Sequence, residues 1–86
     1  MGDIYHFSIE DFHNRLDAAK KYLIKEYAVN LLIVAASSVN DGNKAELIVN
    51  DAFQEVFKHA DQFHSQGAIR EFLYNKVKEE CDKFNS

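Results

Sequence analysis

In "KAELIVNDAFQEVFKHADQF", Lys44 to Phe63, apolar residues recur at helical spacing and polar residues stand between them. Two adjacent apolar rows result: Ile48, Ala52, Val56 and Phe63 in one, and Val49, Phe53, Phe57 and Ala60 in the other. An apolar face this wide predicts a helix that is buried against two neighbouring elements at once. The carboxylates and amides between the rows are either an ordinary solvated face or a surface that another protein recognises.

The segment before this stretch is predicted to be helical as well. Ser8 and Asp11 have the spacing of a capping box, in which a hydroxyl and a carboxylate satisfy the first backbone N–H groups of a helix. One apolar stripe follows at steps of three and four: Ile9, Phe12, Leu16, Ala19, Leu23, Tyr27, Leu31 and then Val34 or Ala35. The stripe predicts either one helix from about Ile9 to Ser38 or two helices with a bend near Glu26.

Two polar segments separate the predicted helices. "SSVNDGNK", residues 37–44, is the strongest break in the chain, and Asn43 with Glu46 is expected to cap the helix that follows. "FHSQG", residues 63–67, is expected to end that helix. A last helix is predicted from about Ala68 to Phe84, with these residues facing inward: Ile69, Phe72, Leu73, Val77, Cys81 and Phe84. The chain is therefore predicted to be all-α, a bundle of three or four helices in a single domain that spans residues 1–86.

Composition limits the functions that this chain can have. Its 86 residues suffice for one modest core, and the absence of proline with only three glycines favours helices. The formal net charge is −4. A net-acidic chain does not bind nucleic acid through bulk charge, because phosphate affinity requires clustered Lys and Arg. Any contact with DNA is therefore expected to be local or assisted by a partner.

The sequence carries no sign of secretion or of an enzyme. No secretory leader is visible, and the longest apolar run, Ala28 to Ala36, is shorter than the about 20 residues that span a bilayer. We therefore expect a cytoplasmic protein. The single cysteine, Cys81, excludes an internal disulfide, and its place on an apolar stripe predicts core packing and no nucleophilic role. No catalytic motif is present, and no cofactor is expected.

Four histidines raise the possibility of a metal site. Glu10 with His13, and Asp61 with His64, have the three-residue spacing that carboxylate-bridged di-iron bundles use. The second pair falls at a predicted helix end, and no inward-facing Glu is evident on a partner helix. We therefore expect solvated side chains, and a metal-binding bundle remains a remote alternative.

Residues 45–84 carry a family resemblance. "AELIVNDAFQEVFKHADQF", residues 45–63, followed by "AIREFLYNKVKEECDKF", residues 68–84, resembles the second conserved region of bacterial RNA polymerase sigma factors of the extracytoplasmic-function type. Matches to that pattern are Ala45, Glu46, Ile48, Val49, Phe53, Asp61, Phe63, Phe72, Leu73, Tyr74 and Cys81, with Asn50 and Asp51 close to the family's Gln and Glu. Half of the pattern is core periodicity, so its specificity is moderate.

The resemblance implies a transcription-initiation domain that catalyses nothing itself. The helix within residues 45–63 would dock on the coiled-coil clamp helices of the polymerase's largest subunit through Glu46, Leu47, Asn50, Asp51 and Gln54. The loop and last helix would hold a flipped base of the melted upstream promoter element through Phe63, His64, Ser65, Asn75, Lys76, Lys78 and Glu79. The implied partners are the polymerase core, single-stranded promoter DNA that the chain alone binds weakly, and an anti-sigma factor; no membrane is implied.

Departures from the family pattern keep a second function open. Leu47 stands where the family has an Asp, and Glu79 stands where an Asn helps to hold the base, although a carboxylate cannot donate a hydrogen bond. The chain also lacks the family's second, promoter-reading helix-turn-helix domain, so we expect either an excised domain or a free-standing relative. The alternative is a helical protein-interaction module without DNA binding, acting as a clamp-binding regulator or a homo-oligomer. For Phe63 alone, packing under the loop and base stacking are equally compatible with the sequence.

Overall fold

Helices account for most of the chain that the computed structural model describes, residues 5–85, and no strand occurs among these residues. The elements are α1 (Ile9–His13), α2 (Asp17–Val39), α3 (Gly42–Lys58), the 3₁₀ turn η1 (Ala60–Gln62) and α4 (Gln66–Asn85). The prediction of an all-α chain with three or four helices is confirmed.

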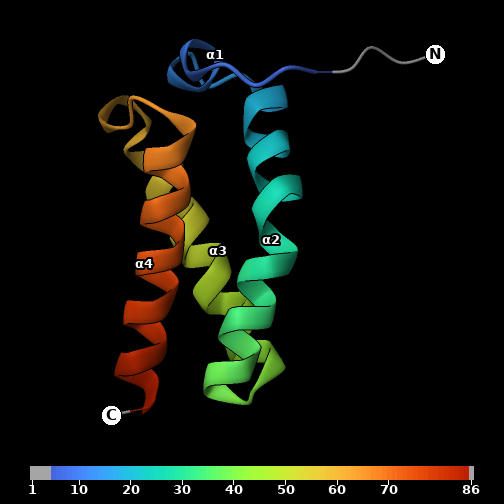
Figure 1. Ribbon diagram of the computed structural model, residues 1–86, viewed down its shortest axis with the longest axis vertical. Helices are drawn as coiled ribbons and strands as arrows, with labels where there is room; N and C mark the ends of the chain where they lie inside the picture. Colours follow the sequence, from blue (N-terminus) through green and yellow to red (C-terminus); the bar gives the residue numbers. More distant parts are fainter. Residues whose placement is uncertain (1–4, 86) are drawn as a thin grey trace, which may run out of the picture.

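The three long helices form the body of the molecule. In Figure 1, α2, α3 and α4 run side by side, and α1 crosses the end at which α2 begins. Each long helix packs against the other two, and α1 also contacts η1. One side of each long helix therefore faces a shared core, while its other side is exposed.

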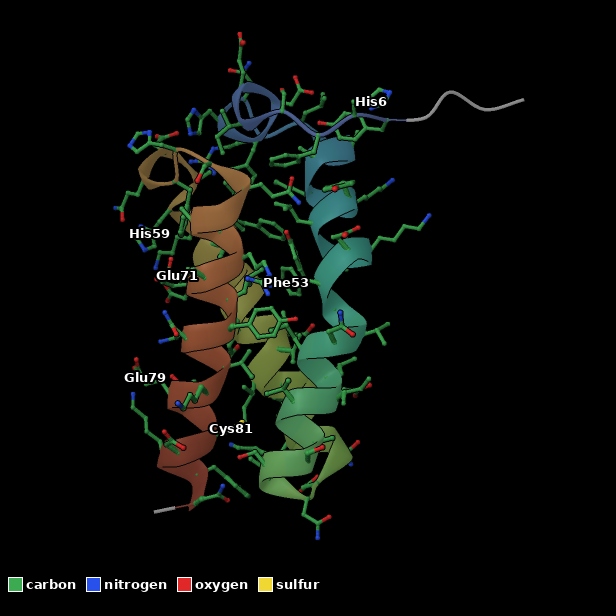
Figure 2. All side chains as sticks on the ribbon, viewed as in Figure 1. His6, Phe53, His59, Glu71, Glu79 and Cys81 are labelled. Carbon is green, nitrogen blue, oxygen red and sulfur yellow. The ribbon has the colours of Figure 1, made fainter. Side chains whose placement is uncertain are left out.

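Rows of buried residues, spaced mostly four apart, build the core. They are Ala19, Leu23, Tyr27, Leu31, Ala35 and Val39 from α2, Ala45, Ile48, Val49, Ala52, Phe53 and Val56 from α3, and Ile69, Leu73, Val77 and Cys81 from α4. In Figure 2, Phe53 points between the helices, whereas Glu71 and Glu79 point outward from α4. Most of the predicted inward residues are thereby confirmed. Leu16 and Phe84 were predicted to face inward and are exposed, because each lies at a helix end where the neighbouring helices no longer cover it.

The first helix ends earlier than its apolar stripe predicts. Neither a continuous helix nor a bend near Glu26 is found; the break lies between α1 and α2, at residues 14–16. Arg15 adopts a left-handed backbone conformation, with φ of 59°, and its guanidinium donates a hydrogen bond of 2.8 Å to the Phe57 carbonyl oxygen. The turn directs α1 across the bundle end, where the Phe12 side chain is buried.

Two predicted helix caps are found in altered form. The Ser8 hydroxyl accepts a hydrogen bond from the Asp11 N–H at 3.1 Å, as predicted, but the Asp11 carboxylate accepts its hydrogen bond from the Tyr5 hydroxyl at 2.8 Å. The helix α3 begins two residues earlier than expected, because Asp41 and not Asn43 is its N-cap. The Asp41 carboxylate accepts from the Lys44 N–H at 3.1 Å.

Aromatic side chains hold the N-terminal segment on the bundle. Phe7 stacks on Tyr22 with ring centroids 5.3 Å apart, and Phe12 packs against Phe57 and Phe63. These contacts come from residues that are distant in sequence, so the segment before α2 is tied to α3 and to the turn that follows it.

The helix α2 is unusually apolar on all sides. By length and composition it is the one described helix that could cross a membrane, and only 28% of its most apolar stretch is buried inside the protein. Core helices of soluble proteins have the same composition, so this feature alone does not assign α2 to a bilayer. Its outward-facing apolar residues nevertheless require an explanation.

Candidate protein-interaction surface

The exposed side of α3 carries all five residues predicted to contact a polymerase. Glu46, Asn50 and Gln54 form one row at four-residue steps, and Leu47 with Asp51 forms a second row beside it. All five side chains are exposed, while the opposite side of α3 is buried in the core. The helix therefore presents a continuous, largely polar face to solvent.

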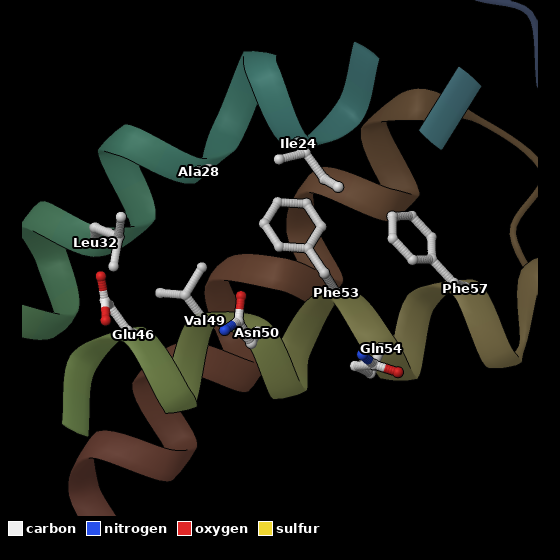
Figure 3. A pocket seen from close by; sticks show the side chains of 9 residues that line it. All are labelled: Ile24, Ala28, Leu32, Glu46, Val49, Asn50, Phe53, Gln54 and Phe57. Atoms are coloured by element: carbon white, nitrogen blue, oxygen red, sulfur yellow. The ribbon is translucent and has the colours of Figure 1, made fainter. Parts of the chain in front are cut away.

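The first of these rows borders a groove between α2 and α3, with a volume of about 330 Å³ (Figure 3). Its floor and far wall are apolar and consist of Ile24, Ala28, Leu32, Val49, Phe53 and Phe57. Figure 3 shows the Ile24 and Phe53 side chains extending toward each other across the groove, with Asn50 and Gln54 along the α3 rim. The groove combines an apolar floor with amide and carboxylate hydrogen-bonding groups. This composition suits the binding of an amphipathic helix.

Charge is distributed unequally along the groove. Lys20 Nζ lies 5.7 Å from the centroid of the Phe57 ring, and Arg15 is hydrogen-bonded to the Phe57 carbonyl, so cations gather at that end. The Glu46 carboxylate lies at the other end. A bound helix would therefore experience opposite charges at its two ends, which favours one orientation over the reverse.

The second row borders a shallower hollow, of about 270 Å³, between α3 and α4. Leu47 and Phe84 are its exposed apolar residues, and Leu47 is 58% exposed. Charged groups surround them: Asp51 and Glu80 line the same hollow, and Lys44 Nζ lies 5.3 Å from the centroid of the Phe84 ring. An exposed apolar centre with a charged rim is the usual anatomy of a protein-binding surface.

Phe63 does not offer a free ring face for base stacking. Its side chain is 9% exposed and packs edge-on against Phe72, with centroids 5.4 Å apart, and against Phe12 at 6.5 Å. Of the two alternatives that the sequence left open, packing under the loop is the one that the structure shows. Phe12 contributes to this burial from α1, which is distant from Phe63 in the sequence.

The other two predicted loop residues are exposed. The Ser65 hydroxyl accepts a hydrogen bond from the Ala68 N–H at 3.1 Å and thereby caps the start of α4. The His64 ring lies edge-on to the ring of His13, with centroids 6.0 Å apart. Ser65 thus has a structural role that is independent of any contact with DNA.

The four residues of α4 predicted to contact DNA form no purely basic surface. Lys76 pairs with Glu80 at 3.3 Å, and the hydrogen bond that the Lys76 ammonium donates to the Glu80 carboxylate is the main reason that the pKa of Lys76 is raised. Glu79 pairs with Lys83 at 3.6 Å. Asn75 and Lys78 are exposed. Acidic partners therefore accompany Lys76 and Lys83, as expected for a solvated face.

The four residues considered for a metal site do not assemble into one. His13 Nε2 donates a hydrogen bond to the Phe63 carbonyl oxygen, in the tautomer that carries the proton on this nitrogen. Within residues 5–85, no group of three His, Cys, Asp or Glu side chains has metal-binding geometry. The set of Glu10, His13, Asp61 and His64 therefore has no geometric support.

Two features of the structure were not predicted from the sequence: one belongs to the groove, and the other joins α4 to α2. The groove requires a second row, Ile24, Ala28 and Leu32, which recurs at four-residue steps on α2 and could have been recognised as a second apolar stripe. Gln66 was also missed: its Nε2 donates hydrogen bonds to Tyr27 Oη at 2.8 Å and to Tyr22 Oη at 3.4 Å. No local sequence pattern predicts the hydrogen bonds of Gln66, because they join α4 to α2.

In comparisons with known proteins, no protein-family model, no curated protein and no solved structure matches the chain.

Proposed function

We propose that this chain is a helical protein-interaction module that binds a helical partner on the exposed side of α3. The observation that carries the proposal is the groove between α2 and α3, in which Glu46, Asn50 and Gln54 stand beside an apolar floor. Helix-in-groove recognition uses such a combination, since the floor supplies apolar burial and the rim sets orientation. Leu47, on the same helix face, adds an exposed apolar anchor.

The partner that we propose is the coiled-coil clamp of a bacterial RNA polymerase. Two observations support this choice: residues 45–84 resemble the corresponding sigma-factor region, and all five residues that the resemblance implicates are exposed on one side of α3. In this role the chain would act in the cytoplasm as a binding domain without catalysis. An anti-sigma factor would compete for the same face.

A contact with single-stranded promoter DNA is the weaker part of the proposal. His64, Asn75 and Lys78 are exposed and available for it, whereas the buried Phe63 ring is not. Glu79 and the net charge of −4 oppose phosphate binding. The alternative of a clamp-binding regulator without DNA binding is therefore favoured by these same residues, and a measurement of DNA affinity separates the two.

Binding to an isolated clamp coiled coil, measured by isothermal titration calorimetry, tests the proposal. We expect micromolar binding that an Asn50→Ala/Asp51→Ala variant weakens at least about tenfold, equivalent to about 1.4 kcal/mol. Glu71→Ala, an exposed substitution on the outer side of α4, is the matched control and should bind as the unchanged chain does. Circular dichroism verifies that each variant is folded.

The outcomes separate the candidate functions. Absence of binding by a folded chain would refute the clamp as partner, and equal binding by the double variant would refute the exposed side of α3 as the docking face. Clamp binding together with micromolar affinity for single-stranded promoter DNA would support the sigma-like role. Clamp binding without DNA affinity would support the regulator.

A further inference from the structure

The groove between α2 and α3 is charged at its two ends and uncharged between them. Asn50 and Gln54 stand along the middle of its α3 rim, and the Glu46 carboxylate stands at one end. Phe57 marks the other end in Figure 3, and there the Arg15 guanidinium donates a hydrogen bond of 2.8 Å to the Phe57 carbonyl oxygen. The two ends of the groove therefore carry charges of opposite sign.

Two lysines enlarge the positive end. Lys20 Nζ lies 5.7 Å from the centroid of the Phe57 ring, and Lys20 precedes Ile24 by four residues, so it continues the α2 wall of the groove. Lys58 is exposed and follows Gln54 by four residues, so it continues the α3 rim. We define the basic end of the groove as Arg15, Lys20 and Lys58.

The protein itself does not neutralise these charges. In the described part of the chain, neither Glu46 nor any residue of the basic end takes part in an ion pair. The same holds for Asp17 and Asp61, the exposed carboxylates nearest in sequence to α2 and α3 at this end. On α2 no charged residue occurs from Tyr27 to Val39, so that helix offers Glu46 no cation. The helix dipoles of α2 and α3 run in opposite directions and largely cancel, which leaves the side-chain charges to act on a bound molecule.

We propose that the groove selects an amphipathic helix that carries carboxylates at one end and a basic side chain at the other. The carboxylates lie against the basic end, and the basic side chain lies against Glu46. Lys58 follows Glu46 by twelve residues, which corresponds to about 18 Å along a helix. The partner therefore carries its opposite charges about twelve residues apart, with apolar residues at steps of three and four between them. The reverse placement brings like charges together at both ends and is disfavoured.

This inference rests on the helix-in-groove binding of the proposed function, although not on the clamp as the partner. Two synthetic peptides of about 16 residues, long enough to reach both ends of the groove, test it. One has Glu in its first turn and Lys in its last turn, with leucines at steps of three and four between them. The other has Gln at each charged position. Fluorescence anisotropy of the labelled peptides measures both affinities.

Lys20→Gln/Lys58→Gln should weaken binding of the charged peptide about threefold or more, because two exposed charge pairs are lost, and should leave binding of the Gln peptide unchanged. Arg70→Gln/Lys78→Gln is the matched control. It removes the same charge from the exposed side of α4, which does not line the groove, and should change neither affinity. At about 1 M salt the difference between the two peptides should shrink, since screening then acts within about 3 Å. Circular dichroism verifies that each variant is folded.

The outcomes separate this inference from the proposed function. An unchanged affinity of Lys20→Gln/Lys58→Gln for the charged peptide, or an equal loss in the α4 variant, would overturn charge selection and leave helix-in-groove binding standing. Tighter binding of the charged peptide by Lys20→Gln/Lys58→Gln would refute the orientation. If neither peptide binds the folded chain at millimolar concentration, helix-in-groove binding is itself refuted, and this inference with it.

Discussion

Gln66 Nε2 donates a hydrogen bond to Tyr27 Oη at 2.8 Å and thereby joins the first turn of α4 to the middle of α2. The tyrosine ring is buried, whereas the glutamine is partly exposed. The bond therefore gives the hydroxyl of a buried tyrosine a partly buried hydrogen-bond partner on α4.

Tyr27→Phe should lower the free energy of unfolding by about 1 kcal/mol, the typical contribution of one buried hydrogen bond. The glutamine is partly exposed and can turn to water, so the loss should not be larger. Urea denaturation followed by circular dichroism measures the change. Tyr74→Phe is the control. It keeps the ring, whose centroid lies 5.2 Å from Arg70 Cζ, and the loss of the Tyr74 hydroxyl should change the free energy of unfolding by less than about 0.5 kcal/mol. Equal effects of the two substitutions would contradict the role of the bond.

Phe63→Ala should behave as a core substitution, with a loss of about 3–5 kcal/mol in the free energy of unfolding. The reason is the burial of its ring between Phe12 and Phe72. Phe63→Leu retains most of the apolar volume and should lose less, which keeps the variant folded for binding experiments. Ser65→Gly, on the same loop, removes only a capping hydroxyl, and the expected loss is a few tenths of a kcal/mol. A Phe63→Ala variant as stable as the unchanged chain would show that the ring is not part of the core.

Stability should fall at alkaline pH. The pKa of Tyr5 is raised above its usual value of 10.0, first by desolvation and then by its hydrogen bond to the Asp11 carboxylate. The pKa of Lys76 is raised above 10.5, mainly by its hydrogen bond to Glu80. Both groups therefore hold their protons to higher pH in the folded chain than in the unfolded chain. Their stabilisation is complete below about pH 10 and is lost as the pH rises through the raised values.

Urea denaturation at a series of pH values from neutral to strongly alkaline checks this expectation. Tyr5→Phe removes one of the two groups, so its free energy of unfolding should fall less steeply with pH than that of the unchanged chain. Tyr74→Phe leaves both groups in place and should follow the unchanged chain. A Tyr5→Phe variant with the same alkaline slope would contradict the assignment.

Periodicity alone was sufficient to predict the fold class and most of the core. Residues such as Leu23, Leu31, Leu73 and Val77 recur at the helical period, and burial follows that period directly. The exposed side of α3 follows from the same rule, since polar residues occupy the positions between the apolar rows. Local sequence therefore determines which side of each helix is buried.

The remaining features depend on contacts between distant segments. The break at residues 14–16 contains neither Gly nor Pro; it depends on a left-handed Arg15 whose side chain reaches the Phe57 carbonyl. Phe63 is buried because Phe12 covers it. The groove between α2 and α3 depends on how the two helices cross. None of these is encoded by a short motif, which is why the sequence left the helix bend and the Phe63 side chain undecided.

The start of α3 gives a direct comparison between the predicted cap and the observed one. Asp41 accepts the Lys44 N–H at 3.1 Å, whereas Asn43 already lies inside the helix. Asp41→Ala should therefore lower the free energy of unfolding by about 1 kcal/mol, because it leaves an N–H group at the helix start without its acceptor. Asn43→Ala should be neutral or slightly stabilising, because alanine has the higher helix propensity. Thermal and urea denaturation of the two variants measure both effects. A larger loss in the free energy of unfolding for Asn43→Ala than for Asp41→Ala would show that Asn43 is the N-cap, as the sequence predicted. Both substitutions lie outside the groove lining, so neither should change the affinity for a partner bound at Asn50 and Gln54, whatever its effect on stability.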